Sequence, residues 1–119
     1  MVYVEGFVLP VPKKNVGKYK RMAQPMGKLM RKLGALEFRE CKGVDLKGRK
    51  GMGLSFVKGA KAKKGETVFF SFIVYKSRAH SNAVWKRLMK HPSMDNMLKE
   101  MPFDTKRMMY GGFQSIVDE

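Results

Sequence analysis

Four segments of the chain alternate or concentrate apolar residues in the manner of β-strands. The first covers residues 2–10, where prolines end it because proline cannot donate to a strand ladder. The second covers residues 35–41, and the fourth covers residues 107–117, whose Gly-Gly pair indicates a bulge or a close approach of another backbone. The third, residues 67–75, is apolar on both faces, which predicts a central strand.

Two segments between these strands repeat their apolar residues every three or four positions, which is the period of a helix. The first helix is predicted from Asn15, a suitable cap, to Gly34, a natural stop, with a kink at Pro25. The second is predicted over residues 78–90. A further short helical piece is expected over residues 93–101 because of its methionines.

The order of elements is therefore β-α-β-β-α-β, which predicts an α+β protein with a ferredoxin-like antiparallel sheet. A chain of 119 residues suits one core, so residues 1–119 are expected to form a single domain. Residues 42–65 are rich in Lys and Gly and are predicted to be a basic loop. An ordinary surface insertion and a basic lid or arm both fit this loop.

Two helices on one face of a four-stranded sheet leave its other face open. The apolar row of the third strand is expected to face the helices: Val68, Phe70, Phe72 and Val74. Each of the first three strands also has a mixed row, in which polar and apolar residues occur together, and these rows should face the open side. They are Tyr3, Glu5, Phe7 and Leu9; Glu37, Arg39 and Cys41; and Thr67, Phe69, Ser71, Ile73 and Tyr75. A second copy closing over these rows would make a homodimer with a half-polar cavity.

Polar residues at this open face are the candidates for a site. Proton transfer needs a group that gains and loses a proton readily, and His80 or Glu37 could supply it, while Arg39 could hold an anion. These three are the catalytic candidates. Ligand contacts are expected from five further residues: Tyr3, Glu5, Ser71, Tyr75 and Arg78. The structural alternatives are an interface ion pair for the charged residues and, for His80, a helix-terminal residue satisfied by its neighbours.

Positive charge is concentrated in the first half of the chain. The 25 Lys and Arg outweigh the 10 Asp and Glu by 15 charges. Such a field could attract polyanions, or it could serve only solubility. Nucleic-acid binding is therefore the alternative function, through the basic loop and five cations of the first helical region: Lys14, Lys18, Arg21, Lys28 and Lys32. An RNA recognition motif does not fit, because Met52 and Leu54 stand where its stacking aromatics would lie.

The sequence offers little support for a metal site or for insertion into a membrane. Cys41 is the single cysteine, and no Cys or His cluster has the spacing of a zinc site, so neither a metal nor another cofactor is expected. Cys41 itself is read as an inert strand cysteine rather than a nucleophile. Because one cysteine cannot form an internal disulfide, a reducing, cytoplasmic setting is predicted. The chain opens directly on a strand pattern, which predicts no export or membrane insertion.

Four stretches carry a resemblance to a known family: YVEGFVLPVP (3–12), GALEFREC (34–41), KGETVFFSFIVYKSRAH (64–80) and PFDTKRMMYGGF (102–113). In this order they make the chain similar to the YbaA-like family of uncharacterised bacterial proteins. That family is similar to the dimeric α/β-barrel superfamily, so the resemblance implies a homodimer of ferredoxin-like protomers. Superfamily relatives include cofactor-independent monooxygenases, lactone isomerases and haem-degrading enzymes.

This analogy suggests that the chain binds a small molecule in the sheet-face cavity, in its enzymatic version as a cofactor-independent oxygenase or isomerase. The high positive charge and the Lys-Gly density of residues 42–65 depart from what is expected of the family.

Overall fold

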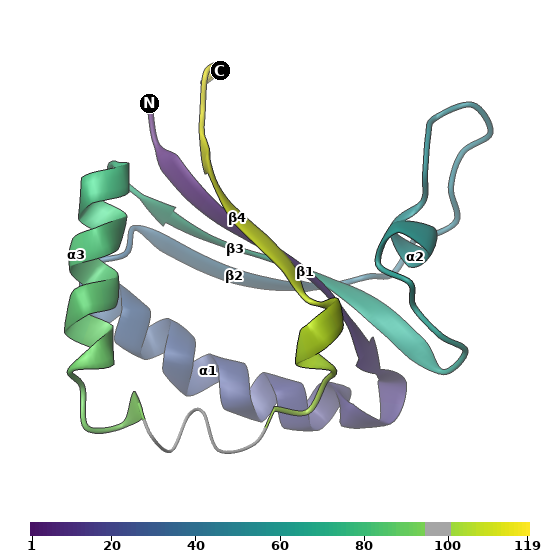
Figure 1. Cartoon of the computed structure of the whole chain (residues 1–119), viewed down its shortest axis with the longest axis horizontal. Coiled ribbons are helices and arrows are strands. Elements are labelled where there is room, and N and C mark those ends of the chain that lie inside the picture. The colour runs from purple at the N-terminus through teal and green to yellow at the C-terminus, as the bar shows by residue number, and fades with distance from the viewer. Residues whose placement is uncertain (95–100) are drawn as a thin grey trace.

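The computed structural model describes residues 1–94 and 101–119 and shows one antiparallel sheet with two long helices (Figure 1). The strands are β1 (Tyr3–Pro12), β2 (Glu37–Lys42), β3 (Glu66–Tyr75) and β4 (Met109–Gln114). The helices are α1 (Val16–Lys32), α2 (Phe56–Gly59) and α3 (Arg78–Met89), with 3-10 turns η1 (Lys13–Asn15) and η2 (Thr105–Arg107). The sheet order is β2-β3-β1-β4, and every neighbouring pair is antiparallel. The predicted α+β class with an antiparallel sheet is confirmed.

The first strand is longer than its prolines predict. β1 continues through Pro10 and Pro12, which lie opposite Val68 and Glu66 of β3. β4 pairs only with residues 3–8 of β1, so the prolines lie where β1 has a neighbour on one side. Such an edge position is where a sheet tolerates proline, and the predicted end at residue 10 is wrong for this reason.

The helix ends follow the sequence in part. The Ser77 side chain accepts a hydrogen bond from the His80 N–H and caps α3. Gly34, just beyond α1, has a φ of +124°, a conformation that favours glycine. Asn15 stands at the cap position of α1, but its side chain donates instead to the carbonyl of Pro102 at 3.0 Å. α1 runs without a break past Pro25, which is exposed.

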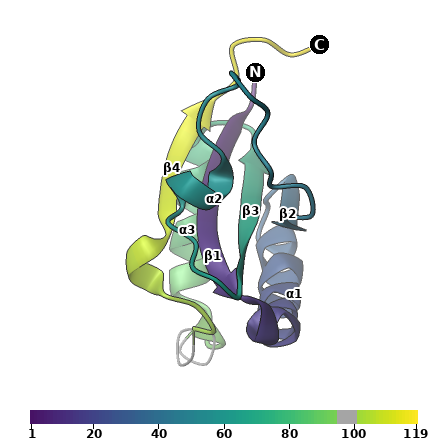
Figure 2. The same cartoon turned by 90° about the vertical axis from the view of Figure 1, so that its right-hand side faces the viewer.

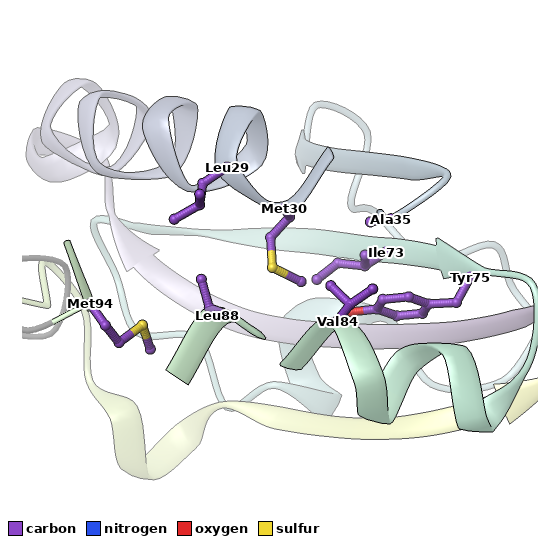
Figure 3. Close-up of a cluster of buried hydrophobic side chains, with 8 residues drawn as sticks. All are labelled: Leu29, Met30, Ala35, Ile73, Tyr75, Val84, Leu88 and Met94. Atoms are coloured by element: carbon purple, nitrogen blue, oxygen red, sulfur yellow. The ribbon is translucent and has the colours of Figure 1, made fainter. Parts of the chain in front are cut away.

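Both long helices cover the same face of the sheet, and the main core lies between them (Figure 3). Met30 of α1 and Leu88 of α3 are fully buried there against Ile73 and Tyr75 of β3. A second cluster joins Leu9 and Val11 of β1 to α1 and β3. The helix-facing row of β3 is thus Thr67, Phe69, Ser71, Ile73 and Tyr75.

The predicted facing of the rows is therefore wrong for two strands. Phe70 is 44% exposed on the open face, whereas Ser71 is 4% exposed under the helices. In β1, Tyr3, Phe7 and Leu9 likewise pack into the helix-side core rather than face the open side. Hydroxyl groups of the mixed rows find partners on other elements, so in the described part of the chain no buried side-chain nitrogen or oxygen lacks a hydrogen-bond partner. The row of β2 that contains Glu37, Arg39 and Cys41 is exposed, as predicted.

The basic loop projects from the end of the sheet beyond α2 (Figure 1, Figure 2). α2 is the only helix between β2 and β3, and it contacts the sheet through Phe56 and Phe70, whose ring centres are 6.2 Å apart. Met52 and Leu54 near the tip are largely exposed. The helical piece expected over residues 93–101 lies mostly outside the described residues.

Of the helices in the described part of the chain, none combines the length and apolar character needed to cross a lipid bilayer.

Candidate functional site

A partly buried carboxyl group lies between α1 and the sheet. Oε1 of Glu40, on the edge strand β2, accepts a hydrogen bond from the Tyr19 hydroxyl of α1 at 2.7 Å. The hydroxyl of Ser71, opposite Glu40 on β3, donates a second and short hydrogen bond to the same oxygen. Tyr19 and Ser71 are 3% and 4% exposed. We call Tyr19, Glu40 and Ser71 the carboxyl site.

The environment of the carboxyl site changes its proton affinity. Burial raises the pKa of Glu40 above its ordinary range, and the hydrogen bonds from Ser71 and Tyr19 offset only part of this increase. Burial also raises the pKa of Tyr19, and the neighbouring Glu40 charge raises it further, so Tyr19 remains a proton donor. A carboxyl with a raised pKa beside a hollow is a candidate for taking up and releasing a proton, as a general base or acid does.

Two hollows meet at this carboxyl. An outer groove of about 760 Å³ lies between α1 and β2, and an inner cavity of about 150 Å³ lies between the helices and the sheet. Tyr19, Ala23, Phe38 and Glu40 border both hollows. The lining of the inner cavity also includes several methionines, Phe103 and the single tryptophan, Trp85. A ligand in either hollow would therefore lie next to the carboxyl.

A helical glycine shapes the floor of the outer groove. Gly27 of α1 is buried against Phe38, and a Cβ atom there would come within 2.7 Å of the Phe38 Cδ1 atom. Glycine therefore lets α1 approach β2 closely at this point. The close approach keeps the Phe38 ring under the groove.

Most predicted ligand contacts lie on the helix side of the sheet in a second polar cluster. Glu5 Oε1 accepts from the Tyr75 hydroxyl and from the Trp85 indole N–H, both at 2.6 Å. Burial raises the pKa of Tyr75, and the hydrogen bond to Glu5 raises it further. Tyr3 packs near Tyr75 with ring centres 6.3 Å apart, and Ser71 belongs to the carboxyl site. The prediction that these residues line the open face is wrong.

The sheet separates Glu37 and Arg39 from His80, the third predicted catalytic residue. Glu37 and Arg39 form an exposed ion pair at 3.1 Å on the open face, where Arg39 lies opposite Phe72. His80 lies at the start of α3, where its Nδ1 accepts from the Lys76 N–H at 2.9 Å and its ring meets Tyr75 edge-on. Arg78 is exposed at the first position of the same helix. The structure does not bring Glu37, Arg39 and His80 together, and their catalytic role stays a prediction.

Sequence reasoning missed the carboxyl site, although the sequence holds a signal for it. Glu40 follows Leu36 and Phe38 in one row of the second strand, and a charged residue in an otherwise apolar row needs buried partners. Tyr19 shows no such signal, because it belongs to the repeat of apolar and aromatic residues that predicts the first helix. The pairing itself depends on how α1 crosses the edge of the sheet.

The predicted basic residues lie on the surface of the first helical region. Lys14, Lys18, Arg21, Lys28 and Lys32 are all exposed, and Lys28 also lines the outer groove. Among the described residues, no three His, Cys, Asp or Glu side chains gather in a way that could hold a metal ion.

Comparison with known proteins gives a family and two relatives. Residues 2–105 match a family described as a protein of unknown function, DUF1428. The uncharacterized protein YbaA of Escherichia coli (strain K12) is 40% identical over 119 residues, which cover 100% of both chains. The uncharacterized protein YbaA of Shigella flexneri has the same identity and coverage.

Proposed function

We propose that this chain, which belongs to the DUF1428 family of proteins of unknown function, binds a small molecule at the carboxyl site. One observation carries the proposal: Glu40, whose pKa is raised by burial, forms the shared wall of two hollows. The groove has the size of ordinary small-molecule sites, which span roughly 300–1,000 Å³. The site lies under α1, not at the open sheet face that the sequence pattern favoured.

The enzymatic version of this function is proton transfer. The ionised Glu40 carboxylate takes a proton from an acidic C–H or O–H bond of the ligand, whose electron pair stays behind as an enolate or alkoxide. An isomerase returns the same proton to another atom of the ligand, so atoms and electrons balance without a co-reactant. A cofactor-independent oxygenase would need dioxygen as the oxidant of the resulting anion. Tyr19 and Ser71 hold the carboxyl in place through their hydrogen bonds.

Native mass spectrometry of gently purified protein, followed by deuterium exchange, tests this function. We expect wild type to retain a discrete small mass and, in heavy water, to exchange a carbon-bound proton of that compound. Glu40→Gln should lose the exchange while keeping the fold. Glu37→Gln, which removes a carboxyl from the open face of the same strand, should keep it. Exchange at the wild-type rate in Glu40→Gln would show that Glu40 is not the base, and absence of any bound compound would count against the binding function.

We propose further that two copies pair through the open sheet face. This face has a shallow hollow of about 660 Å³ lined by apolar residues and glycines from β1, β3 and β4. Phe70, Met109 and Phe113 on it are 44%, 47% and 63% exposed, an apolar patch that soluble monomers seldom present. Glu37 and Arg39 stand at its β2 side as a polar rim, which is the usual anatomy of an interface.

A second copy is the occupant that fits this face best. The strand order β2-β3-β1-β4 with antiparallel neighbours supports a ferredoxin-like protomer, and two such sheets facing each other would form a dimeric α/β barrel. A two-fold interface uses the same patch on both copies, and a largely apolar patch is complementary to itself.

Light scattering with size-exclusion chromatography tests this pairing. Wild type should elute at twice the 13.6 kDa chain mass, and Phe72→Asp should elute as a monomer because it places a charge in the apolar patch. Lys32→Asp, a charge change on α1, should leave the dimer intact. A monomeric wild type, or an unchanged mass for Phe72→Asp, would refute the interface.

Nucleic-acid binding is the second candidate, favoured by the exposed cations of the first helical region. Binding of this kind weakens with salt, with a slope of about 0.9 in log–log terms for each phosphate neutralised on duplex DNA. Lys28→Glu with Lys32→Glu should abolish binding of a duplex oligonucleotide if this function is correct. Unchanged binding by that variant would exclude α1 as the nucleic-acid surface.

A cytoplasmic setting, also proposed, is supported by the exposed free thiol of Cys41.

A further inference from the structure

Cations surround the outer groove on both sides. α1 contributes Lys20, Lys28 and Arg31, and the end of β2 contributes Lys42. Within the described chain, Lys20, Lys28 and Lys42 take part in no ion pair, and Arg31 donates only a long hydrogen bond, 3.4 Å, to the carbonyl of Ala35. Among the described residues, the positive charge of this rim is therefore not neutralised by an ion pair.

Negative charge at the groove is limited to one residue. Among the described residues, Glu40 is the single acidic side chain in the lining, and its burial favours the neutral form. The remaining floor is apolar or aromatic, with Val16, Ala23, Phe38 and Phe69. An apolar floor below an uncompensated basic rim suits a molecule with an apolar body and an anionic end.

We propose that the outer groove selects small amphiphilic anions, which place a carboxylate or phosphate group at the basic rim and an apolar body on the floor. The inference rests on the small-molecule function proposed for the carboxyl site, and it adds the chemical class of the ligand. The planar guanidinium of Arg31 can bind either anionic group through two parallel hydrogen bonds, and the lysines add charge around it.

The shape of this region favours a small ligand over a polyanion. The rim cations come from two elements and face one concave space, whereas a nucleic-acid backbone is bound along an extended basic stripe. Cations outside the groove provide a natural control, because Lys14, Arg21 and Lys32 are exposed and do not line it.

Four probes with the same alkyl chain test the class of ligand: decanoate, decyl phosphate, decanol and decylammonium. Calorimetric titration below the micellar range, with the amide shift of Gly27 locating the site, should show the two anions binding about tenfold or more tighter than decanol, which corresponds to one good charge contact. Decylammonium should bind least. The affinities of decanoate and decyl phosphate show which head group is preferred. Inorganic phosphate shows whether an anion binds without an apolar body, and we expect that it does not.

Two variants that remove the same charge test the location. In the rim variant, Lys20→Gln, Lys28→Gln and Lys42→Gln are combined, and decanoate affinity should fall about tenfold while decanol binding is kept. In the control variant, the three exposed cations outside the groove, Lys14, Arg21 and Lys32, are changed to Gln, and decanoate affinity should stay near that of wild type. Lys28→Gln alone repeats the test if the triple variant does not fold.

The outcomes separate the inference from the function on which it rests. Equal affinity for decanoate and decanol would overturn the anion selectivity. An equal loss of affinity in the two triple variants would overturn the placement of the anionic group at the rim. Small-molecule binding stands in both cases. If none of the four probes shifts the Gly27 amide signal, the inference is overturned. If, in addition, the purified protein retains no compound, the proposed small-molecule function is overturned as well.

Discussion

Replacing Glu40 by glutamine should change how the stability of the protein depends on pH. Glutamine keeps the size of the side chain and an oxygen that can accept from Tyr19 and Ser71, but it carries no titrating proton. Because burial raises the pKa of Glu40 in the folded state, the folded protein holds this proton to a higher pH than the unfolded chain does.

The sign and size of the effect follow from this difference. Below the ordinary glutamate pKa of 4.5 both states are protonated, and Glu40 adds no pH dependence. Between that value and the raised pKa, the folded state binds about one more proton, so the free energy of unfolding of wild type falls by about 1.4 kcal/mol per pH unit. For a chain of this size that slope corresponds to roughly 5 °C in Tm per pH unit. Above the raised pKa the difference between the two proteins becomes constant.

Thermal unfolding of wild type and Glu40→Gln at a series of pH values measures this slope. The variant should gain stability relative to wild type as the pH rises, and the height of the plateau gives the pKa rise directly. Glu37→Gln is the matched control, because Glu37 is an exposed carboxyl on the open face of the same strand, and its effect should stay within about 0.5 kcal/mol. Parallel curves for wild type and Glu40→Gln from pH 4 to pH 7 would refute the raised proton affinity and with it the proton-transfer role.

Two further predictions concern groups that hold the site and its surroundings. Tyr19→Phe removes one donor to the carboxyl site while keeping the ring contacts, so it should lower the free energy of unfolding by about 1–3 kcal/mol in chemical denaturation, whereas the exposed Tyr110→Phe should change nothing measurable. Arg107 forms a two-bond ion pair with Glu66 and lowers the pKa of that carboxyl, so the pair stabilises the fold above the ordinary glutamate pKa and loses this effect as the pH falls. Arg107→Met should lower Tm at pH 7 and make the loss of stability on acidification shallower; an acid limb as steep as that of wild type would contradict this reasoning.

Local patterns in the sequence were sufficient for most of the secondary structure. The apolar run of residues 67–75 predicts β3, the cap at Ser77 begins α3, and Gly34 lies just beyond the end of α1. These features depend on neighbours in the chain, such as a side-chain oxygen near a free N–H or a backbone angle that only glycine adopts easily. They do not depend on which other element packs nearby.

The facing of the sheet was decided only by the tertiary structure. An alternating strand has two faces, and its pattern does not state which one the helices cover. The wholly apolar row of β3 was expected under the helices, yet the row with Ser71 and Tyr75 lies there. Glu40 and Glu5, from two other strands, accept hydrogen bonds from these two hydroxyl groups. Burial of a polar group depends on a partner, and a partner distant in the sequence is known only once the strands are paired.

The candidate site, like the facing of the sheet, depends on the tertiary structure. The sequence by itself determined the residue types, the strands and helices that carry them, and the excess of positive charge along the first half of the chain. Only the tertiary structure placed Tyr19 of α1 over the edge strand beside Glu40, and turned Lys28 and Lys42 toward one groove. Contacts within one element repeat with its period and can be read from the chain, whereas contacts between elements depend on how those elements cross, which no local pattern contains.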